Sequence, residues 1–199
     1  MKRAFDSALA LIGLALSAPV SLVCASLIKL EDGGPVFYTQ ERVGRGGRVF
    51  QALKFRSMRP DAESETGPLQ ARPGDARVTR VGRMMRATAM DELPQLWNIL
   101  RGDMSFVGPR ALRPGEIERE GNELVALEAV PGYVQRIAVR PGLTGIAQVY
   151  ARRDIPRRYK FKYDALYVRH QSFWLDIRLI LLSFWISFRG TWESAGRKY

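Results

Sequence analysis

The longest apolar run in the chain lies at its start. Residues 7–28 carry no charged side chain, and a straight helix of that length would extend ~33 Å, enough to span a bilayer. Pro19 interrupts the run. Because proline cannot donate a hydrogen bond to the carbonyl four residues earlier, that of Ala15, we expect the helix to kink or break there. Each half is then too short to cross a membrane alone, and the hydroxyls of Ser17 and Ser21 can satisfy the freed backbone groups.

Three structures compete for this segment: a cleaved secretory signal, a spanning helix, and a broken helix that enters the membrane and returns. Asp6 argues against a signal peptide, and a lipoprotein signal ending at Cys24 would have leucine where Ser21 stands. Removing the two basic residues and one acidic residue before the run from the totals of 31 and 20 leaves 29 basic and 19 acidic residues. Both flanks are therefore positive. Because positive flanks prefer the cytoplasm, we favour a re-entrant helix over residues 1–32.

A second apolar segment, residues 173–188, has the periodicity of a helix. Arg178 lies on its apolar side, whereas the remaining polar positions fall on one narrow stripe, made of Arg169, Ser172, Asp176, Ser183 and Ser187. We predict a helix lying in the membrane interface, with Arg178 reaching lipid phosphate; a buried core helix is the alternative. Just upstream, residues 157–163 mix cations with aromatic rings, which suits a membrane surface, a nucleic acid, or simply a solvated helix face.

Between these ends the pattern predicts a short β-hairpin. Residues 36–38 and 49–56 are typical of strands, and residues 43–48 form a glycine-rich turn. This turn lacks the third glycine and the βαβ surroundings of a dinucleotide loop, so we reject that function for it. Alternate residues of a strand share a face, so Lys54 and Arg56 are placed to grip a diphosphate, although a solvated strand face is the simpler interpretation.

After a predicted loop over residues 61–75, a cationic helix start leads to two adjacent carboxylates, Asp91 and Glu92. Asp91 suits the N-cap of a helix with Pro94 in its first turn, and capping alone would explain it. Arginines nevertheless converge on this helix start from both sides, namely Arg80, Arg83, Arg86, Arg101 and Arg110. Such an arrangement is typical of a phosphate site, where adjacent carboxylates serve as nucleophile and base or bind Mg²⁺. A later block, residues 139–153, predicts tight turns but no function by itself.

Composition and charge narrow the chemistry. The 199 residues suffice for one domain, and 46% of them are hydrophobic, which excludes a disordered basic tail. A net charge of +11 implies an anionic neighbour: nucleic acid, lipid headgroups or a phosphate-rich substrate. The chain has one cysteine, Cys24, and one histidine, His170, which excludes disulfide frameworks and zinc clusters. Its chemistry must therefore use carboxylates, hydroxyls, lysine and arginine.

Seven motifs occur in order along nearly the whole chain. They are Lys2-Arg3 with Phe5-Asp6, Gly34-Pro35-Val36-Phe37-Tyr38-Thr39-Gln40 with Arg42-Val43-Gly44, Lys54-Phe55-Arg56-Ser57-Met58, Arg77-Val78-Thr79, Asp91-Glu92-Leu93-Pro94-Gln95-Leu96-Trp97-Asn98, Gly102-Asp103-Met104-Ser105-Phe106-Val107-Gly108-Pro109-Arg110, and Arg140-Pro141-Gly142-Leu143-Thr144-Gly145. Together they resemble the monotopic phosphoglycosyl transferases, the bacterial sugar transferase family that starts lipid-linked glycan assembly. Because the chain begins at the re-entrant segment, it resembles the small members of that family without additional N-terminal membrane helices.

The resemblance implies a fold and a location. We expect a mostly helical α+β protein, with a proline-broken re-entrant membrane helix over residues 1–32. Residues 33–199 would form a cytoplasmic catalytic domain with a short β-hairpin and interfacial amphipathic helices, and the two parts would make one structural unit. Its place would be the cytoplasmic face of the bacterial inner membrane, among membrane lipids. A homodimer is left open.

The resemblance also implies a two-step reaction. Asp91 would attack the β-phosphate of a UDP-sugar, expel UMP and hold the sugar 1-phosphate until polyprenyl (undecaprenyl) phosphate takes it over. Glu92 would position or deprotonate the lipid phosphate, and Mg²⁺ held by Asp91 and Glu92 would neutralise the pyrophosphate. By motif match, the phosphate-binding residues would be Lys54, Arg86, Arg110 and Arg152. Phosphoryl transfer of this kind needs positioning and positive charge rather than histidine.

The sequence departs from the family pattern in two places, and three other functions are alternatives to the one that the resemblance implies. Ala18 stands before Pro19 where the family usually has serine, and Ile146, Tyr150 and Ala151 replace usual members of the last motif, which weakens the role given to Arg152. A nucleic-acid-binding protein would explain the charge but not the uncharged segment, and we expect no nucleic acid partner. A membrane-surface protein without catalysis would use Asp91 for capping only. A glycosyltransferase with a metal-binding Asp-x-Asp is disfavoured because the chain has no such tripeptide.

Overall fold

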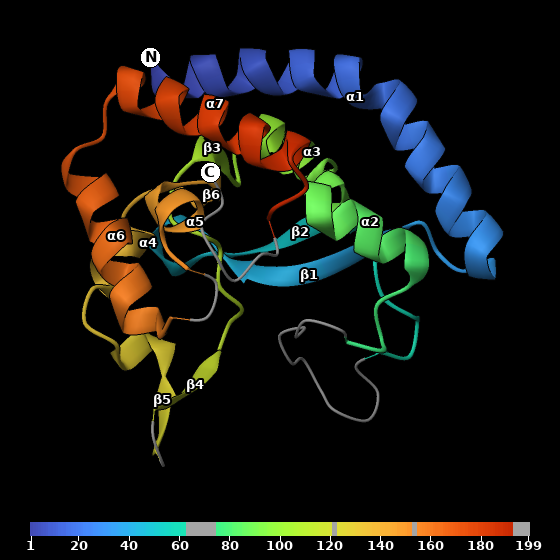
Figure 1. Ribbon diagram of the computed structural model, residues 1–199. Coiled ribbons are helices and arrows are strands. Elements are labelled where there is room, and N and C mark those ends of the chain that lie inside the picture. Colours follow the sequence, from blue (N-terminus) through green and yellow to red (C-terminus); the bar gives the residue numbers. More distant parts are fainter. Residues whose placement is uncertain (63–74, 121–122, 153–154, 193–199) are drawn as a thin grey trace.

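The computed structural model describes residues 1–62, 75–120, 123–152 and 155–192 (Figure 1). Within these ranges the chain is mostly helical with two-stranded sheets, which confirms the predicted α+β class. The elements are α1 (Lys2–Asp32), β1 (Phe37–Val43), β2 (Val49–Phe55), α2 (Arg80–Thr88), α3 (Gln95–Arg101), β3 (Ser105–Val107), β4 (Ile117–Glu120), β5 (Glu123–Ala126), α4 (Tyr133–Ile137), β6 (Gly142–Thr144), α5 (Ile146–Tyr150), α6 (Arg157–Arg169) and α7 (Phe173–Phe188). Most of the predicted loop over residues 61–75 lies outside the described residues.

Helix α1 bends without breaking. It is one continuous helix of 31 residues with Pro19 inside it, and Figure 1 shows a bend near its middle. Of the two outcomes expected at Pro19, the structure shows a bend and not a break (Figure 1), because a single missing N–H removes one backbone bond and leaves its neighbours in place. The Ser17 hydroxyl donates to the Leu14 carbonyl at 3.5 Å, one residue before the carbonyl expected to need it. The helix ends at Gly33, whose φ of 71° is in the left-handed region that glycine adopts without strain.

The outer face of α1 is apolar and exposed. This helix is long and apolar enough to cross a membrane, and little of it is buried against the protein. Its exposed hydrophobic residues include Leu11, Ile12, Leu16, Leu22 and Val23. Water-soluble proteins rarely leave so large a continuous apolar surface uncovered, so α1 indicates association with a membrane.

Helices α1 and α7 meet at their N-terminal ends, where Phe5 contacts Phe173, and two polar positions of α7, Asp176 and Ser183, bond to the rest of the protein. The buried Asp176 carboxylate accepts a hydrogen bond from Lys2 at 2.6 Å and one from the Tyr167 hydroxyl at 2.9 Å. The Ser183 and Thr144 hydroxyls are hydrogen-bonded to each other. The exposed side carries apolar residues instead, namely Phe173, Trp174, Leu181, Phe184, Trp185 and Phe188. An amphipathic helix with its apolar side outward fits the predicted interfacial helix, and the core-helix alternative holds only for its inner face.

The first charged residues of the chain fix α1 to the protein. Arg3 donates to the carbonyls of Ile99 and Leu100, and so satisfies backbone groups at the C-terminal end of α3. The buried Asp6 carboxylate accepts from the backbone N–H of Phe106 at 3.2 Å. The motif at the N-terminus therefore ties the membrane helix to the elements that lead toward Arg110.

The predicted hairpin is confirmed, and it leans on α3. Strands β1 and β2 pair antiparallel in a register that sets Tyr38 opposite Lys54. Asn98 of α3 accepts from the Leu53 N–H at 2.9 Å and donates to the Gln51 carbonyl at 2.7 Å. The Asn98 side chain thus bonds to backbone groups at the free edge of β2, as a neighbouring strand would. These bonds fix the position of α3 relative to the strand that carries Lys54.

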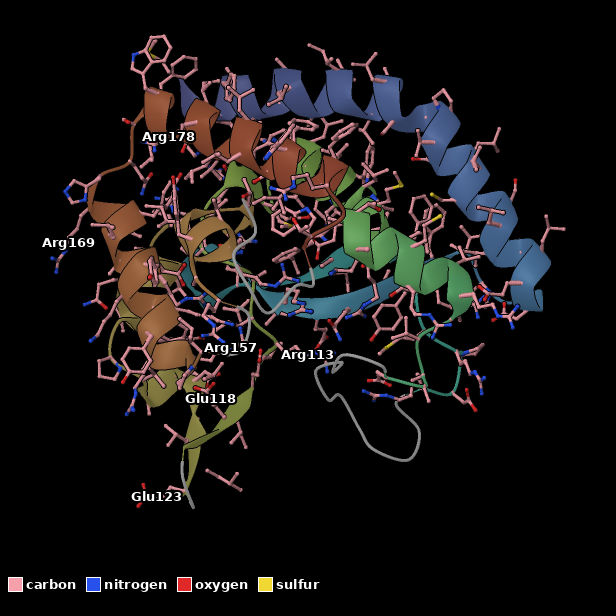
Figure 2. The ribbon with its side chains drawn as sticks, in the orientation of Figure 1. Arg113, Glu118, Glu123, Arg157, Arg169 and Arg178 are labelled. Carbon is pink, nitrogen blue, oxygen red and sulfur yellow. The ribbon has the colours of Figure 1, made fainter. Side chains whose placement is uncertain are left out.

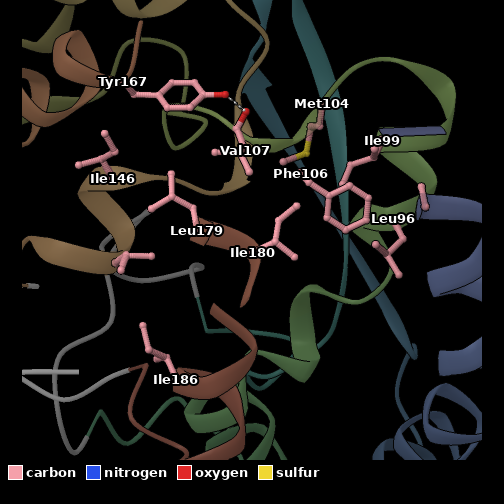
Figure 3. Close-up of a cluster of buried hydrophobic side chains, with 12 residues drawn as sticks. Leu96, Ile99, Met104, Phe106, Val107, Ile146, Tyr167, Leu179, Ile180 and Ile186 are labelled. Carbon is pink, nitrogen blue, oxygen red and sulfur yellow. Dashed lines mark hydrogen bonds between the residues drawn. The ribbon is translucent and has the colours of Figure 1, made fainter. Parts of the chain in front are cut away.

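A hydrophobic core lies between α1, α3, α5, α6 and α7 (Figure 3). Its fully buried members include Ile99, Met104, Leu179 and Ile186, and the Tyr167 hydroxyl within it donates to the Val107 carbonyl at 2.9 Å. The glycine-rich block that the sequence left without a function forms β6 and α5. It lies so close to the turn after β3 that a Cβ at Gly142 would stand 2.0 Å from the Gly108 nitrogen.

Candidate active site

The two adjacent carboxylates lie in a short 3-10 turn, Met90–Glu92, between α2 and α3. Helix α3 begins at Gln95 with Pro94 at its N-cap position. The prediction that Asp91 caps this helix is therefore wrong, because the chain turns once more before the helix starts. Ala89 makes that turn with φ 57° and ψ 19°, a left-handed conformation that costs a non-glycine residue roughly 1–2 kcal/mol. Backbone strain of this kind is found next to functional groups.

Glu92 holds two cations from different elements. Its Oε1 atom accepts from Lys54 Nζ of β2 at 2.6 Å and from Arg110 Nη2, which follows β3, at 3.0 Å. Burial by itself would raise the pKa of Glu92, but the charges of Lys54 and Arg110 and their hydrogen bonds outweigh it and hold the pKa far below its usual value. Burial lowers the pKa of Lys54, with Glu92 and Asp91 opposing the change. The arrangement keeps Glu92 ionised and fixed in direction.

Asp91 has the opposite environment. Its side chain is buried, and within the described residues no hydrogen bond or ion pair engages its carboxylate. Burial raises the pKa of Asp91; the charge of Lys54 opposes the rise, that of Glu92 adds to it, and Arg86 opposes it more weakly. A carboxylate with no protein partner, in a cation-lined site, is available to attack a phosphorus atom.

A single cavity of about 1140 Å³ connects these groups. The carboxylates and the cations nominated by motif match all line it: Asp91, Glu92, Lys54, Arg86, Arg110 and Arg152. Their roles in binding stay predictions. Arg152 is exposed. Arg80, Arg83 and Arg101, which the sequence pattern placed at the same helix start, are not among its lining residues.

Arg56 lines the same cavity as Lys54 but has a different ion-pair partner. Strand β2 ends at Phe55, and the buried Arg56 guanidinium pairs with Asp32 at the end of α1. The solvated-face alternative is wrong, since both side chains are largely buried. The joint grip of Lys54 and Arg56 on a diphosphate stays a prediction.

Other cations of the cavity wall were not nominated from the sequence. Arg42 of β1 donates to the Ala111 carbonyl at 3.0 Å, and burial together with the charges of Arg110 and Arg113 lowers its pKa to about 10. Arg113 and Arg157 also line the cavity (Figure 2), and Arg157 Nη2 binds Glu116 Oε1 at 2.8 Å. Arg42 lies within a motif quoted above, so its position was visible in the sequence although its function was not.

The opposite wall of the cavity is apolar. It is formed by Leu16 and Val20 of α1 and by Ile180, Phe184 and Phe188 of α7. These belong to the two helices whose outer faces are exposed and apolar, so the cavity reaches from the carboxylates to the surface that faces the membrane. Among the described residues, no group of three or more histidine, cysteine or acidic side chains could hold a metal ion by itself.

A carboxylate pair between a cationic wall and a membrane-facing apolar wall defines a membrane-associated site for phosphate chemistry. Comparison with known proteins agrees: the family model for bacterial sugar transferases matches residues 1–190, and the chain belongs to this family. A UDP-N-acetylgalactosamine-undecaprenyl-phosphate N-acetylgalactosaminephosphotransferase of Aeromonas hydrophila is 42% identical over 183 residues, covering 90% of this chain and 42% of the relative.

Two further relatives show how far the likeness extends. An undecaprenyl-phosphate glucose phosphotransferase of Komagataeibacter xylinus is 43% identical over 189 residues, or 92% of this chain and 35% of the relative. The exopolysaccharide production protein PSS of Rhizobium leguminosarum is 44% identical over 185 residues, or 90% of this chain and 91% of the relative. This chain therefore spans less than half of the first two relatives and nearly the full length of the third.

Proposed function

We propose that this protein transfers a sugar 1-phosphate from a UDP-sugar to polyprenyl phosphate and releases UMP. The observation that carries the proposal is the position of Asp91, buried without a protein partner among the described residues, in a cavity that has cations on one wall and the membrane-facing helices on the other. The names of relatives 42% and 43% identical support the substrate classes. The particular sugar is left open.

In the first step, an Asp91 oxygen attacks the β-phosphorus of the UDP-sugar. A bond forms between that oxygen and phosphorus, the bond from the β-phosphorus to the bridging oxygen breaks, and UMP leaves with the bonding electrons. In the second step, a phosphate oxygen of the lipid attacks the same phosphorus and breaks its bond to Asp91. The lipid then carries a diphosphate-linked sugar and the carboxylate is regenerated.

Glu92 serves this reaction by positioning rather than by taking a proton. A carboxylate whose pKa is held far below its usual value is a weak base at neutral pH. Its two ion pairs instead direct Lys54 and Arg110 toward the space beside Asp91. These cations then stabilise negative charge on the transferring phosphoryl group.

Asp91 and Glu92, together with phosphate oxygens of the substrate, are suitable ligands for Mg²⁺. Mg²⁺ is usually held by one or two carboxylates together with substrate phosphates, so the absence of a larger acidic cluster among the described residues is compatible with it. Asp91 and Glu92 would hold the ion, which would neutralise the pyrophosphate when bound. The position of the protein would be the cytoplasmic face of the bacterial inner membrane, since residues on both sides of the apolar run are basic.

The experiment is an assay of UMP release. Detergent-purified protein with Mg²⁺ and undecaprenyl phosphate is given a panel of UDP-sugars, beside Asp91→Asn. We expect release with one sugar or a few related sugars, and none from Asp91→Asn. Equal UMP release by the wild-type protein and Asp91→Asn would overturn the proposal and leave Asp91 with a structural role only.

A further inference from the structure

The backbone around Arg110 is held at five consecutive carbonyls. Gln148 donates to Gly108, the Gly142 N–H to Pro109, and the Val43 N–H to Leu112. Arg136 Nη2 donates to the Arg110 carbonyl at 2.5 Å, and Arg42 Nη1 donates to the Ala111 carbonyl at 3.0 Å. The donors come from α5, β6, β1 and α4, elements far apart in the sequence. The segment that presents Arg110 to Glu92 is therefore fixed from several sides.

Among these donors, Arg136 is the one whose burial is hardest to explain as a contribution to the stability of the fold. Its side chain is buried on α4, its Nε donates to Asp164 Oδ2 of α6 at 3.0 Å, and its guanidinium lies 4.6 Å from the centre of the Phe161 ring. Burial lowers the pKa of Arg136 and raises that of Asp164, so desolvation outweighs their mutual attraction. Buried ion pairs of this kind are often replaceable by apolar residues without loss of stability.

We propose that Arg136, oriented by Asp164, is a positioning residue that fixes Arg110 for the transfer reaction. One guanidinium bonds with its Nε to Asp164 and with its Nη2 to the Arg110 backbone, and the Arg110 side chain then reaches the Oε1 atom of Glu92. The chain of contacts is thus Asp164, Arg136, Arg110, Glu92. This inference rests on the proposed function, since it assigns a part in that reaction.

The shape of the contact explains why arginine is needed. A guanidinium has several N–H donors in a rigid plane and can bind a carboxylate and a carbonyl at once, whereas a lysine ammonium is a point charge on a flexible stem. Arg136→Lys keeps the positive charge beside Asp164 but loses the rigid, planar set of N–H donors. A misplacement of about 1 Å in a reacting group costs on the order of 10²-fold in rate.

The test is a double-mutant cycle on the rate of sugar-phosphate transfer, measured with labelled UDP-sugar. Arg136→Lys and Arg136→Met are each made in the wild-type chain and in Arg110→Ala, or in Arg110→Lys if the alanine variant has no measurable rate. We expect ~10²-fold losses in kcat in the wild-type background and less than ~10-fold further loss once Arg110 is changed. Thermal unfolding in the same detergent reports folding of each variant.

Arg140→Met is the matched control, because Arg140 also donates from a guanidinium to a backbone carbonyl, that of Gly102 at 2.8 Å. Its effect should be the same in both backgrounds. Equal losses for Arg136 variants in both backgrounds, or a wild-type rate in Arg136→Lys, would overturn the inference. If Arg136→Met does not fold, Arg136→Lys decides alone. Absence of transfer by the wild-type chain with every sugar would instead count against the proposed function, so the two failures are distinguishable.

Discussion

Asp91 and Glu92 are neighbours in the chain but have opposite electrostatic environments. Glu92 takes both nearby cations on one oxygen and keeps a low pKa, whereas burial raises the pKa of Asp91, which has no partner among the described residues. Environments that push the pKa values of two carboxylates apart usually assign them different tasks. In the proposed reaction, Glu92 organises the cations and Asp91 is the nucleophile.

Asp91→Asn should abolish turnover and stabilise the fold. We expect a loss of roughly 10³-fold or more in rate, as for removal of other nucleophiles. Because the folded pKa of Asp91 lies above its ordinary value, its contribution to stability is present at low pH and is lost as pH rises through the folded pKa. Asparagine should therefore raise the unfolding temperature at neutral pH, and the difference should close in acid. Thermal unfolding across pH checks this; a variant less stable at neutral pH contradicts it.

Lys54→Met should lower the rate by about 10²–10³-fold, because it removes one of two cations beside the transferring phosphate. It should also raise the pKa of Glu92, whose ionised form Lys54 stabilises. The rate of UMP release as a function of pH measures both effects. Lys162→Met, which removes the same charge from an exposed position on α6, is the control. Similar rates for the two variants would show that Lys54 acts only through net charge.

The sequence nominated residues that meet in one cavity and missed others that depend on packing. Asp91, Glu92 and Arg86 stand close together in the chain, so local pattern was enough to nominate them, but the same pattern included Arg80, Arg83 and Arg101, which do not line the cavity. The pairing of Arg56 with Asp32 joins residues 24 positions apart and was not visible in the strand pattern. Arg136 was not nominated at all, since its partners Asp164 and Arg110 are 28 and 26 residues away and only the fold brings them together.

At the scale of elements, α7 was predicted with the bounds it has, and its stripe of polar positions was predicted too. The direction of that stripe was not predictable from periodicity, because a helical wheel does not say which side faces the protein. The contacts of Asp176 with Lys2 and Tyr167 answer this: the polar side is the inner one. In α1, a kink or a break was expected at the proline, and the helix bends without breaking (Figure 1).

The exposed apolar side of α7 should bind membranes. Replacing Trp174, Trp185 and Phe188 with serine removes large exposed rings without touching the cavity carboxylates. We expect a clear loss of co-flotation with vesicles of anionic phospholipid, since interfacial binding scales with buried apolar area. Leu124→Ser, at an exposed position on β5, is the control and should leave flotation unchanged. Unchanged flotation of the triple variant would exclude α7 from the membrane contact.

Pro19→Ala tests whether the bend in α1 sets the topology. Restoring an N–H at this position should straighten the helix toward a spanning arrangement. A cysteine placed at residue 2 is labelled from either side of the membrane, with and without the Pro19→Ala substitution, after replacement of Cys24. We expect labelling from the cytoplasmic side alone with proline and from the other side with alanine. Labelling that stays cytoplasmic in both would show that the proline does not determine the topology.

At the scale of the molecule, one cavity joins two kinds of surface. Cations from β1, β2 and the segment after β3 line one wall, and the membrane-facing helices line the other. Under the proposed function, a water-soluble nucleotide sugar and a lipid phosphate would reach the same carboxylate from these two surfaces. Neither surface is contiguous in the sequence, which is why the motifs predicted the participants and the fold was needed to show how they meet.

The most direct test of the account is a search for the covalent intermediate in the absence of lipid acceptor. Purified protein is mixed with the accepted UDP-sugar and Mg²⁺, and UMP release and intact protein mass are followed together. The account predicts a burst of UMP approaching one equivalent per protein, a matching mass increase of one sugar phosphate, its loss when undecaprenyl phosphate is added, and none of these with Asp91→Asn. Release of UMP only after lipid is added, with no change in protein mass, would contradict a nucleophilic Asp91.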